Sequence, residues 1–297
     1  MVLRLAMKAT ISRHRANLPL VIVNHAPRPR TYLMCPPDHY AVEYAINPWM
    51  TAGTPVDPGL AAKQWDALRE TLVRLGHTVH MLAPRAGLPD MVFAANGAFT
   101  VDGIAFGARF RYAQRAAEAA AHRAWYLERN AEWRHVAGRE TNEGEGDFAY
   151  LPDAYGGVIL AGYGFRTEAA AHAEAQDTLG RPVVSLRLVD PCFYHLDLAL
   201  AALDDATPIY YPGAFSAASQ EVLRQLFPAA VIADEADATA FGLNLVSDGR
   251  HVLFHADATG LARRLSSAGY VPLPVDLGEL KKGGGGVKCC VAELRLV

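Results

Sequence analysis

Four consecutive glycines near the C-terminus, Gly283–Gly286, constrain this chain more than any other stretch. Glycine loses more backbone entropy on folding than any other residue, so a compact protein keeps such a run where no side chain would fit. Lys288, Cys289 and Cys290 follow, and residues 291–297 have the composition of a β-strand. The pattern predicts a tight loop that delivers one thiol to the start of a final strand.

A cysteine in this position is either a nucleophile or a small core residue. Only the thiolate is nucleophilic, and a nearby cation, either Lys288 or a positively charged substrate, favours that form. The alternative is a glycine-rich linker that ends in two buried cysteines, because free cysteine often fills space in a core. The loop alone leaves both interpretations open.

The charge balance and the cysteines restrict the class of protein. The net charge is −3, with 28 basic and 31 acidic residues and no basic tract, which argues against nucleic acid or an anionic membrane as a main partner. No apolar run is long enough to span a bilayer, and the N-terminus lacks the apolar core of a signal peptide. The cysteines match no zinc pattern, so we expect a cytoplasmic protein with reduced thiols and neither a metal nor an organic cofactor. They are Cys35, Cys192, Cys289 and Cys290.

Short strands and single helices alternate along the chain, without a long linker or a block of like charge. Residues 58–75 have helical periodicity, and residues 88–98 resemble a strand that ends in a tip of small and polar residues at Asn96. Residues 1–17 are basic and poorly patterned. We therefore expect a flexible lead-in over residues 1–17 and a single catalytic α/β domain over residues 18–297.

Four loops in this order along the chain resemble those of the guanidine-modifying superfamily, which comprises arginine deiminases, dimethylargininases and amidinotransferases. Each loop alone is a weak signal, and the ordered set, which nearly spans the chain, is a strong one. The loops are Phe93-Ala94-Ala95-Asn96, Glu143-Gly144-Glu145-Gly146-Asp147, Phe193-Tyr194-His195-Leu196-Asp197 and Gly284-Gly285-Gly286-Val287-Lys288-Cys289.

Three further stretches resemble the arginine dihydrolase branch of that superfamily. They are Met34-Cys35-Pro36-Pro37 through Ile46-Asn47-Pro48-Trp49-Met50, Ala161-Gly162-Tyr163-Gly164-Phe165-Arg166, and Tyr210-Tyr211-Pro212-Gly213-Ala214-Phe215. The resemblance implies the pentein fold, a five-bladed α/β-propeller of ββαβ-type pseudo-repeats. The sequence itself shows no repeat period.

The resemblance also implies a mechanism and a catalytic set. A guanidinium carbon is a poor electrophile, so a thiolate divides its hydrolysis into two steps through a covalent thiouronium. By match to the family, Cys289 is the nucleophile, His195 is the general acid and base, and Glu143 orients the histidine. Asp197 would bind the guanidinium nitrogens. Glu145, two residues beyond Glu143, is the alternative orienting carboxylate.

Three more residues are expected in the site by the same match. Asn47 would line it, Arg115 would clamp the substrate α-carboxylate, and Asn96 would contact the guanidinium. Taken singly, these residues and the catalytic set also fit ordinary roles, such as turn caps, a surface arginine or a core histidine. Only the ordered set favours catalysis.

Asn96 decides which substrate the sequence favours. Deiminases and dimethylargininases have an aspartate there, which pairs with the cationic guanidinium. An amide offers a donor and an acceptor instead, so it can hold a neutral ureido group and allow citrulline to be attacked again. We therefore predict conversion of free arginine to ornithine, CO2 and ammonia, with dimethylargininase as the alternative and amidinotransferase as the less favoured one. A non-catalytic arginine-binding relative is a further alternative, and the number of subunits is open, with a homo-oligomer among the choices.

Overall fold

Five small sheets of three strands form the framework of the computed structural model, which describes residues 25–296. In each sheet an inner strand pairs antiparallel with a middle strand, and the middle strand pairs parallel with an outer one. In order from inner to outer strand, the sheets are β15 (Ala292–Glu293), β1 (Thr31–Met34) and β2 (Thr78–Met81); β3 (Ala98–Val101), β4 (Ile104–Gly107) and β5 (Arg134–Ala137); β6 (Phe148–Leu151), β7 (Val158–Tyr163) and β8 (Val183–Arg187); β9 (Leu200–Ala202), β10 (Pro208–Tyr210) and β11 (Val231–Ile232); β12 (Val246–Ser247), β13 (His251–His255) and β14 (Val271–Val275).

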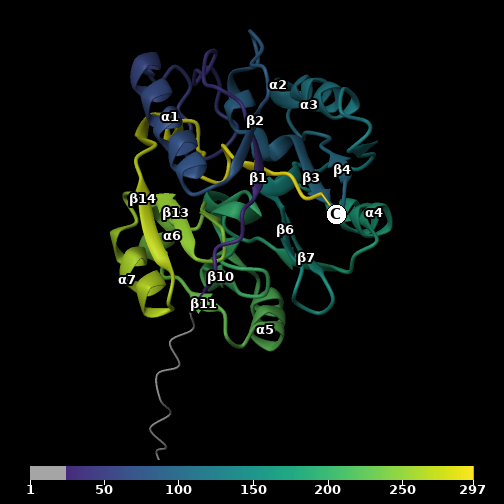
Figure 1. The fold of residues 1–297 in the computed structure, drawn as a ribbon, viewed down its shortest axis with the longest axis vertical. Helices are drawn as coiled ribbons and strands as arrows, with labels where there is room; N and C mark the ends of the chain where they lie inside the picture. Colours follow the sequence, from purple (N-terminus) through teal and green to yellow (C-terminus); the bar gives the residue numbers. More distant parts are fainter. Residues whose placement is uncertain (1–24, 297) are drawn as a thin grey trace, which may run out of the picture.

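A helical crossover joins the middle strand to the outer strand in every sheet, because neighbouring parallel strands cannot be joined by a tight turn. Figure 1 shows these helices around the rim, outside the strands. They are α1 (Pro58–Arg74), α2 (Ala113–Ala116) with α3 (Glu118–Leu127), α4 (Ala170–Leu179), α5 (Ala217–Leu226) and α7 (Thr259–Ser267), and the shorter α6 (Glu235–Thr239) and α8 (Gly278–Lys281) lie between units. The predicted five-bladed α/β-propeller of ββαβ units is confirmed.

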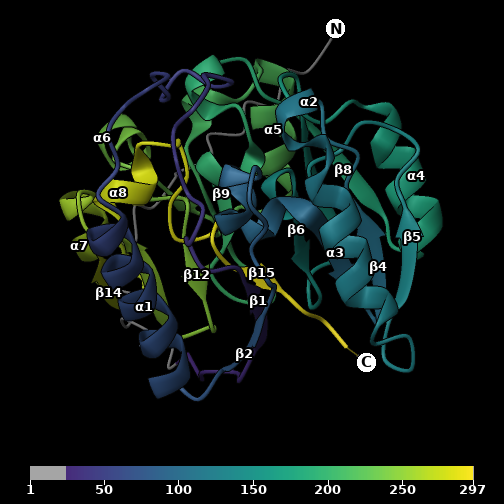
Figure 2. The ribbon, with the colours of Figure 1, turned by 90° about the horizontal axis from the view of Figure 1, so that it is seen from above.

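The two ends of the described chain close the ring of blades. The first blade takes β1 and β2 from the N-terminal part and its inner strand, β15, from the C-terminal part, with Leu33 opposite Ala292. In Figures 1 and 2 the yellow C-terminal segment lies beside the purple segment that carries β1. This closure brings the glycine loop, which precedes β15, to the centre of the molecule.

Helix α1 shows how local sequence fixes one blade. The Asp57 side chain accepts from the Leu60 amide at 3.0 Å, and Pro58 occupies the first turn, where its missing N–H costs nothing. Trp65, Leu68 and Leu72 recur at helical spacing and are buried against the sheet side. The helix predicted over residues 58–75 is therefore confirmed.

Two predicted strands differ from the structure. Residues 88–98 do not form a strand, because they fold into two 3₁₀ turns, Pro89–Val92 and Ala94–Gly97, before β3 begins at Ala98. Pro89 has no N–H for a ladder and suits the first position of a helical turn. The final strand is only β15 (Ala292–Glu293), and Cys289 and Cys290 lie in a turn before it.

Part of the predicted organisation lies outside the described residues. Residues 1–24 lie outside the described part of the chain. They include the predicted lead-in over residues 1–17 and the first residues of the predicted catalytic domain. Within residues 25–296, no helix has the length and apolar character needed to cross a membrane.

Candidate active site

The loops that precede the inner strands meet at one end of the propeller axis. Each of five loops brings at least one polar side chain to this end, and all of these side chains are buried. The residues are Asn96 before β3, Glu143 before β6, His195 and Asp197 before β9, Asn244 before β12, and Cys289 before β15. The structure thus brings together residues as far apart in the sequence as Asn96 and Cys289, which are 193 positions apart. Residues of the His195 loop contact both Glu143 and the Cys289 loop.

Cys289 is held by two side chains from neighbouring blades. Its Sγ lies 3.3 Å from Asp197 Oδ2 and 3.2 Å from Asn244 Nδ2, and its backbone N–H donates to Asn244 Oδ1 at 3.1 Å. Because the Asn244 amide contacts both the backbone and the thiol, it fixes the position of the sulfur. An amide N–H directed at the sulfur also stabilises the thiolate form.

The glycine loop is required by close packing around the thiol. A Cβ on Gly285 would lie 2.3 Å from the Phe93 ring, and one on Gly284 would lie 2.6 Å from Asn47 Oδ1. Gly284 also has φ of +80°, which L side chains rarely adopt. No larger residue fits at these two positions without displacing its neighbours.

The unliganded environment favours the neutral thiol. Burial raises the pKa of the Cys289 thiol well above its ordinary value, and the Asp197 carboxylate raises it further. Burial likewise raises the pKa of Asp197 to about 7. The Lys288 ammonium offsets only part of the rise in the pKa of Asp197, and it is itself paired with Glu145 Oε2 at 2.7 Å. A cationic substrate is therefore the group that can favour the thiolate.

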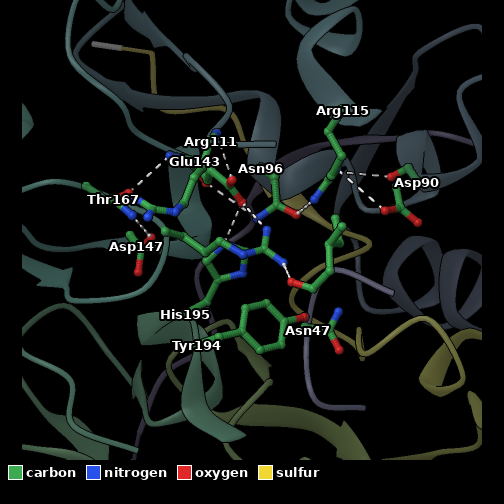
Figure 3. Close-up of polar contacts among 12 residues, drawn as sticks. Asn47, Asp90, Asn96, Arg111, Arg115, Glu143, Asp147, Thr167, Tyr194 and His195 are labelled. Atoms are coloured by element: carbon green, nitrogen blue, oxygen red, sulfur yellow. Dashed lines mark hydrogen bonds and ion pairs between the residues drawn. The ribbon is translucent and has the colours of Figure 1, made fainter. Parts of the chain in front are cut away.

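His195 and Glu143 form a buried pair. His195 Nε2 lies 2.8 Å from Glu143 Oε2, and Arg166 Nη1 donates to the same oxygen at 2.7 Å. Burial alone would raise the pKa of Glu143, but Arg166 and His195 together hold it well below its ordinary value. The carboxylate therefore stays charged and fixes the ring. Figure 3 shows the contacts of Glu143 with its neighbours. His195 Nδ1 has no partner within residues 25–296, which leaves this nitrogen for a ligand.

Glu145, the alternative orienting carboxylate, has no contact with His195 in the described structure. Its oxygens bind Lys288 at 2.7 Å and Arg295 at 2.5 Å, and Oε2 also accepts from the Glu293 amide. Glu143 is thus the carboxylate that contacts the histidine.

Asn96 has a fixed orientation. Its Oδ1 accepts from Arg115 Nη1 at 2.8 Å, and its Nδ2 donates to the Glu143 carbonyl at 3.4 Å (Figure 3). Arg115 itself is buried and makes a bidentate ion pair with Glu118, with its Nη2 at 2.8 Å and its Nε at 3.0 Å. Most of its donors are therefore occupied by the protein. Its role as the clamp of a substrate carboxylate stays a prediction, while its contact with Asn96 orients that amide.

Asn47 reaches the site from the segment between β1 and α1. Its Nδ2 donates to the Gly283 carbonyl at 3.2 Å, and its Oδ1 accepts from the Trp49 amide at 2.9 Å. Asn47 thus supports the glycine loop in addition to lying near the catalytic side chains. Its predicted contact with substrate stays a prediction.

The sequence does not predict a role for three further residues that contact the catalytic groups or the glycine loop. Asn244 holds Cys289, Arg166 holds Glu143, and the Tyr194 hydroxyl donates to the Gly284 carbonyl at 2.6 Å. Arg166 and Tyr194 lie inside stretches that resemble the family. Asn244 has no such signal, and only its position in the loop before an inner strand relates it to the others.

The described residues contain no group of three or more His, Cys, Asp or Glu side chains arranged to hold a metal ion. The arrangement instead provides a thiol, a histidine with one unpaired nitrogen, and carboxylates for a cation. These groups suit nucleophilic attack on a cationic carbon followed by proton transfer.

No family model matches this chain. It is similar over 268 residues to the N(G),N(G)-dimethylarginine dimethylaminohydrolase of Mycobacterium tuberculosis, with 53% identity across 90% of this chain and 87% of that protein. The chain belongs to the guanidine-modifying (pentein) superfamily. It is a hydrolase of guanidino C–N bonds, as predicted.

Members of this superfamily with a second activity are also similar to the chain. The bifunctional arginine dihydrolase/ornithine cyclodeaminase ArgZ of Synechocystis is 35% identical over 260 residues, which cover 86% of this chain and 36% of that protein. The solved N-terminal domain of ArgZ, a cysteine-to-serine variant bound to substrate, superposes with a TM-score of 0.85 and 33% identity, covering 90% of this chain and 98% of that domain. A dimethylarginine dimethylaminohydrolase adduct, at 18% identity and a TM-score of 0.72, shows the shared fold alone.

Proposed function

We propose that this protein is an arginine dihydrolase that converts L-arginine and two molecules of water to ornithine, CO2 and two molecules of ammonia. The observation that carries the proposal is the asparagine at position 96, whose amide is oriented by Arg115 at 2.8 Å. Cys289 is the nucleophile, His195 the acid and base, Glu143 its orienting carboxylate, and Asp197 a ligand of the guanidinium.

The first hydrolysis uses the groups around Cys289. A guanidinium that contacts both Asp197 and the thiol supplies the positive charge that favours the thiolate, with the Asn244 amide as an additional donor. The thiolate attacks the guanidinium carbon, and ammonia leaves with a proton from His195, whose unpaired Nδ1 is the nitrogen open to a ligand. Water then hydrolyses the thiouronium, His195 takes up the proton, and citrulline forms. ArgZ has been solved with a reaction intermediate bonded covalently to it, which supports a covalent route.

The second hydrolysis depends on retention of citrulline, whose ureido group is neutral. Asn96 has one contact at each end of its amide, so one N–H and one acceptor lone pair remain for a ligand. These groups match a ureido oxygen and N–H without leaving an unpaired charge in a buried site, as an aspartate would. Cys289 can then attack the same carbon again, and with a second water the citrulline is converted to ornithine, CO2 and the second ammonia.

A second candidate, dimethylargininase, is favoured by the similarity to the Mycobacterium tuberculosis protein of that name. It would use the same thiol and histidine to convert dimethylarginine and one water to citrulline and dimethylamine. The two candidates differ in whether methyl groups fit beside Asn96 and whether citrulline is released.

Mass spectrometry of the products distinguishes the candidates. The purified protein is incubated separately with arginine, dimethylarginine, citrulline and agmatine, and the Cys289→Ser variant serves as the control for background hydrolysis. We expect ornithine from arginine, with about two ammonia per ornithine. Consumption of dimethylarginine alone, with citrulline as the final product, would contradict the dihydrolase proposal and support the second candidate.

A further inference from the structure

A cavity of about 400 Å³ lies at the end of the propeller axis opposite the catalytic loops. Its walls come from the last residues of the inner strands and the residues that follow them, including Asp102 after β3, Pro152 after β6, Asp204 after β9 and Ser247 in β12. The catalytic residues precede the same strands. We refer to this space as the rear cavity.

The rear cavity extends to the back of the catalytic centre. Asp197 lines the cavity, and its Oδ2 lies 3.3 Å from Cys289 Sγ. Lys288, the residue before the nucleophile, also lines it and forms an ion pair with Glu145, another lining residue, at 2.7 Å. The cavity and the thiol are therefore separated by single side chains.

The lining favours water and small cations. It contains six carboxylates, at positions 102, 145, 197, 204, 205 and 293, and three cationic side chains, at positions 30, 288 and 295. The cations are bound in ion pairs, such as Arg295 with Glu293 at 2.8 Å and Arg30 with Asp205 at 2.6 Å, which hold the wall in place. An excess of negative charge attracts ammonium and disfavours anions.

The catalytic end is covered by the segment that connects β1 and α1. Asn47 donates to the Gly283 carbonyl, Arg166 donates to the Ile46 carbonyl at 2.9 Å, and the Trp49 indole donates to the Cys192 carbonyl at 2.8 Å. These contacts tie the segment to loops of three blades. A substrate held beneath it by its amino-acid end would block that side while the thiouronium waits for water.

We propose that the rear cavity is a port through which water reaches the thiouronium and ammonium leaves. The proposal rests on the covalent hydrolysis described under Proposed function. In the step concerned, the cationic thiouronium on Cys289 and one water give a neutral ureido product, the free thiol and one proton. The C–S bond breaks, and a new C–O bond forms at the same carbon. The proton leaves through His195, and ammonia released in the preceding step departs as ammonium past Asp197.

The test narrows the port without changing the catalytic side chains. Ala149 in β6 and Ala202 in β9 are half-buried and line the cavity, so the double variant Ala149→Phe/Ala202→Phe places two rings in it. The control is Ala218→Phe, at an exposed position of the outer helix α5. Rapid quenching with arginine in a single turnover, followed by mass spectrometry of the protein, measures formation and breakdown of the covalent adduct.

We expect adduct formation at the unmodified rate in both variants, and breakdown at least tenfold slower in the double variant only. Breakdown of the adduct at the unmodified rate in the folded double variant would overturn the proposal that the rear cavity is a port. The rate of breakdown relative to formation does not depend on the folded fraction, and if the double variant does not fold, Ala202→Phe is measured in the same way with the same criterion. Citrulline as the final product would contradict the dihydrolase proposal but not the port, because its formation also needs one water and releases one amine.

Discussion

The two ends of the propeller axis use the same five inner strands and differ in how completely their buried charges are paired. Glu143 and Glu145 show the difference within one loop. Glu143 faces the catalytic end, where it holds His195 and Arg166, and Glu145 faces the opposite end, where it binds Lys288 and Arg295. In the same way, Cys289 faces the catalytic end and the adjacent Lys288 faces the rear cavity.

Unpaired polar atoms occur at both ends: Arg30 Nε and Tyr32 Oη belong to residues that line the rear cavity, whereas those at the catalytic end belong to predicted catalytic groups. His195 Nδ1 and Asp197 Oδ1 are buried and have no hydrogen-bond partner among the described residues. Such atoms cost free energy in the unliganded protein, so a protein retains them where a ligand supplies the partner. The carboxylates of Glu145 and Glu293 at the other end are paired with Arg295, which indicates a structural role.

The neighbouring cysteines give the largest expected contrast. We expect Cys289→Ser to abolish turnover, because a serine hydroxyl in place of the thiol is a far weaker nucleophile at neutral pH. Cys290→Ser should retain most activity, since Cys290 is a fully buried residue of the hydrophobic core and the mechanism assigns it no step. Steady-state ammonia release measures both. Loss of activity in the Cys290 variant together with an active Cys289→Ser variant would reverse the assignment.

Replacement of the histidine should have the next largest effect. His195→Ala removes the only histidine that contacts Glu143 in the described structure, and we expect the rate to fall on the order of 10²-fold or more. Either the thiouronium accumulates or it fails to form, and mass spectrometry of the quenched protein distinguishes the two. Near-normal kinetics would leave His195 as a packing residue and break the mechanism.

The two glutamates test the comparison directly. Glu143→Gln should lower kcat by a large part of the histidine's contribution of about 10²- to 10⁴-fold, because the ring loses its charged partner. Glu145→Gln should lower the stability by about 3–5 kcal/mol, since Lys288 and Arg295 lose a buried partner, with a smaller effect on kcat. Urea unfolding and kcat are measured for both variants. A large fall in kcat for Glu145→Gln, together with a loss of stability alone for Glu143→Gln, would contradict the functions assigned to the two ends.

Asn244 offers a pH-dependent test at the catalytic end. Asn244→Leu removes the N–H directed at the sulfur, which stabilises the thiolate, so the pKa of Cys289 should rise further. We expect the pH dependence of alkylation by iodoacetamide to shift to higher pH and kcat/KM to fall about tenfold at neutral pH, as for loss of a hydrogen bond to a charged group. An unchanged alkylation profile would assign Asn244 to packing alone.

The family resemblance predicts both the five-bladed frame and the residues that lie together at the catalytic end, whereas sequence patterns alone predict neither. Cys289, His195 and Glu143 follow from the order of the family loops, and the structure brings all three to one end of the axis. The five-fold repetition is not visible because each unit is held by backbone pairing and apolar contacts, which many different sequences satisfy. The strand predicted over residues 88–98 is wrong for a similar reason, since an apolar run fits a 3₁₀ turn as well as a strand when it is short and begins with proline.

The contacts of single residues are the part that sequence patterns do not reveal. Glu143 and Glu145 are separated by one glycine, and only the 3₁₀ turn over Gly144–Gly146 sends them to opposite ends. Arg115 resembles a surface arginine in the sequence, yet it is buried and orients Asn96. Asn244 lies between two leucines, and no neighbouring motif indicates that it holds the thiol.

The fate of the guanidino carbon tests the central claim most directly. Arginine labelled with ¹³C at that carbon is followed by NMR with the unmodified protein and with Asn96→Asp, which preserves the shape of the side chain and replaces the amide with a carboxylate. We predict labelled CO2 and bicarbonate from the unmodified protein, and a shift towards labelled citrulline with one ammonia per arginine from the variant. Labelled citrulline as the end product of the unmodified protein would contradict the dihydrolase account.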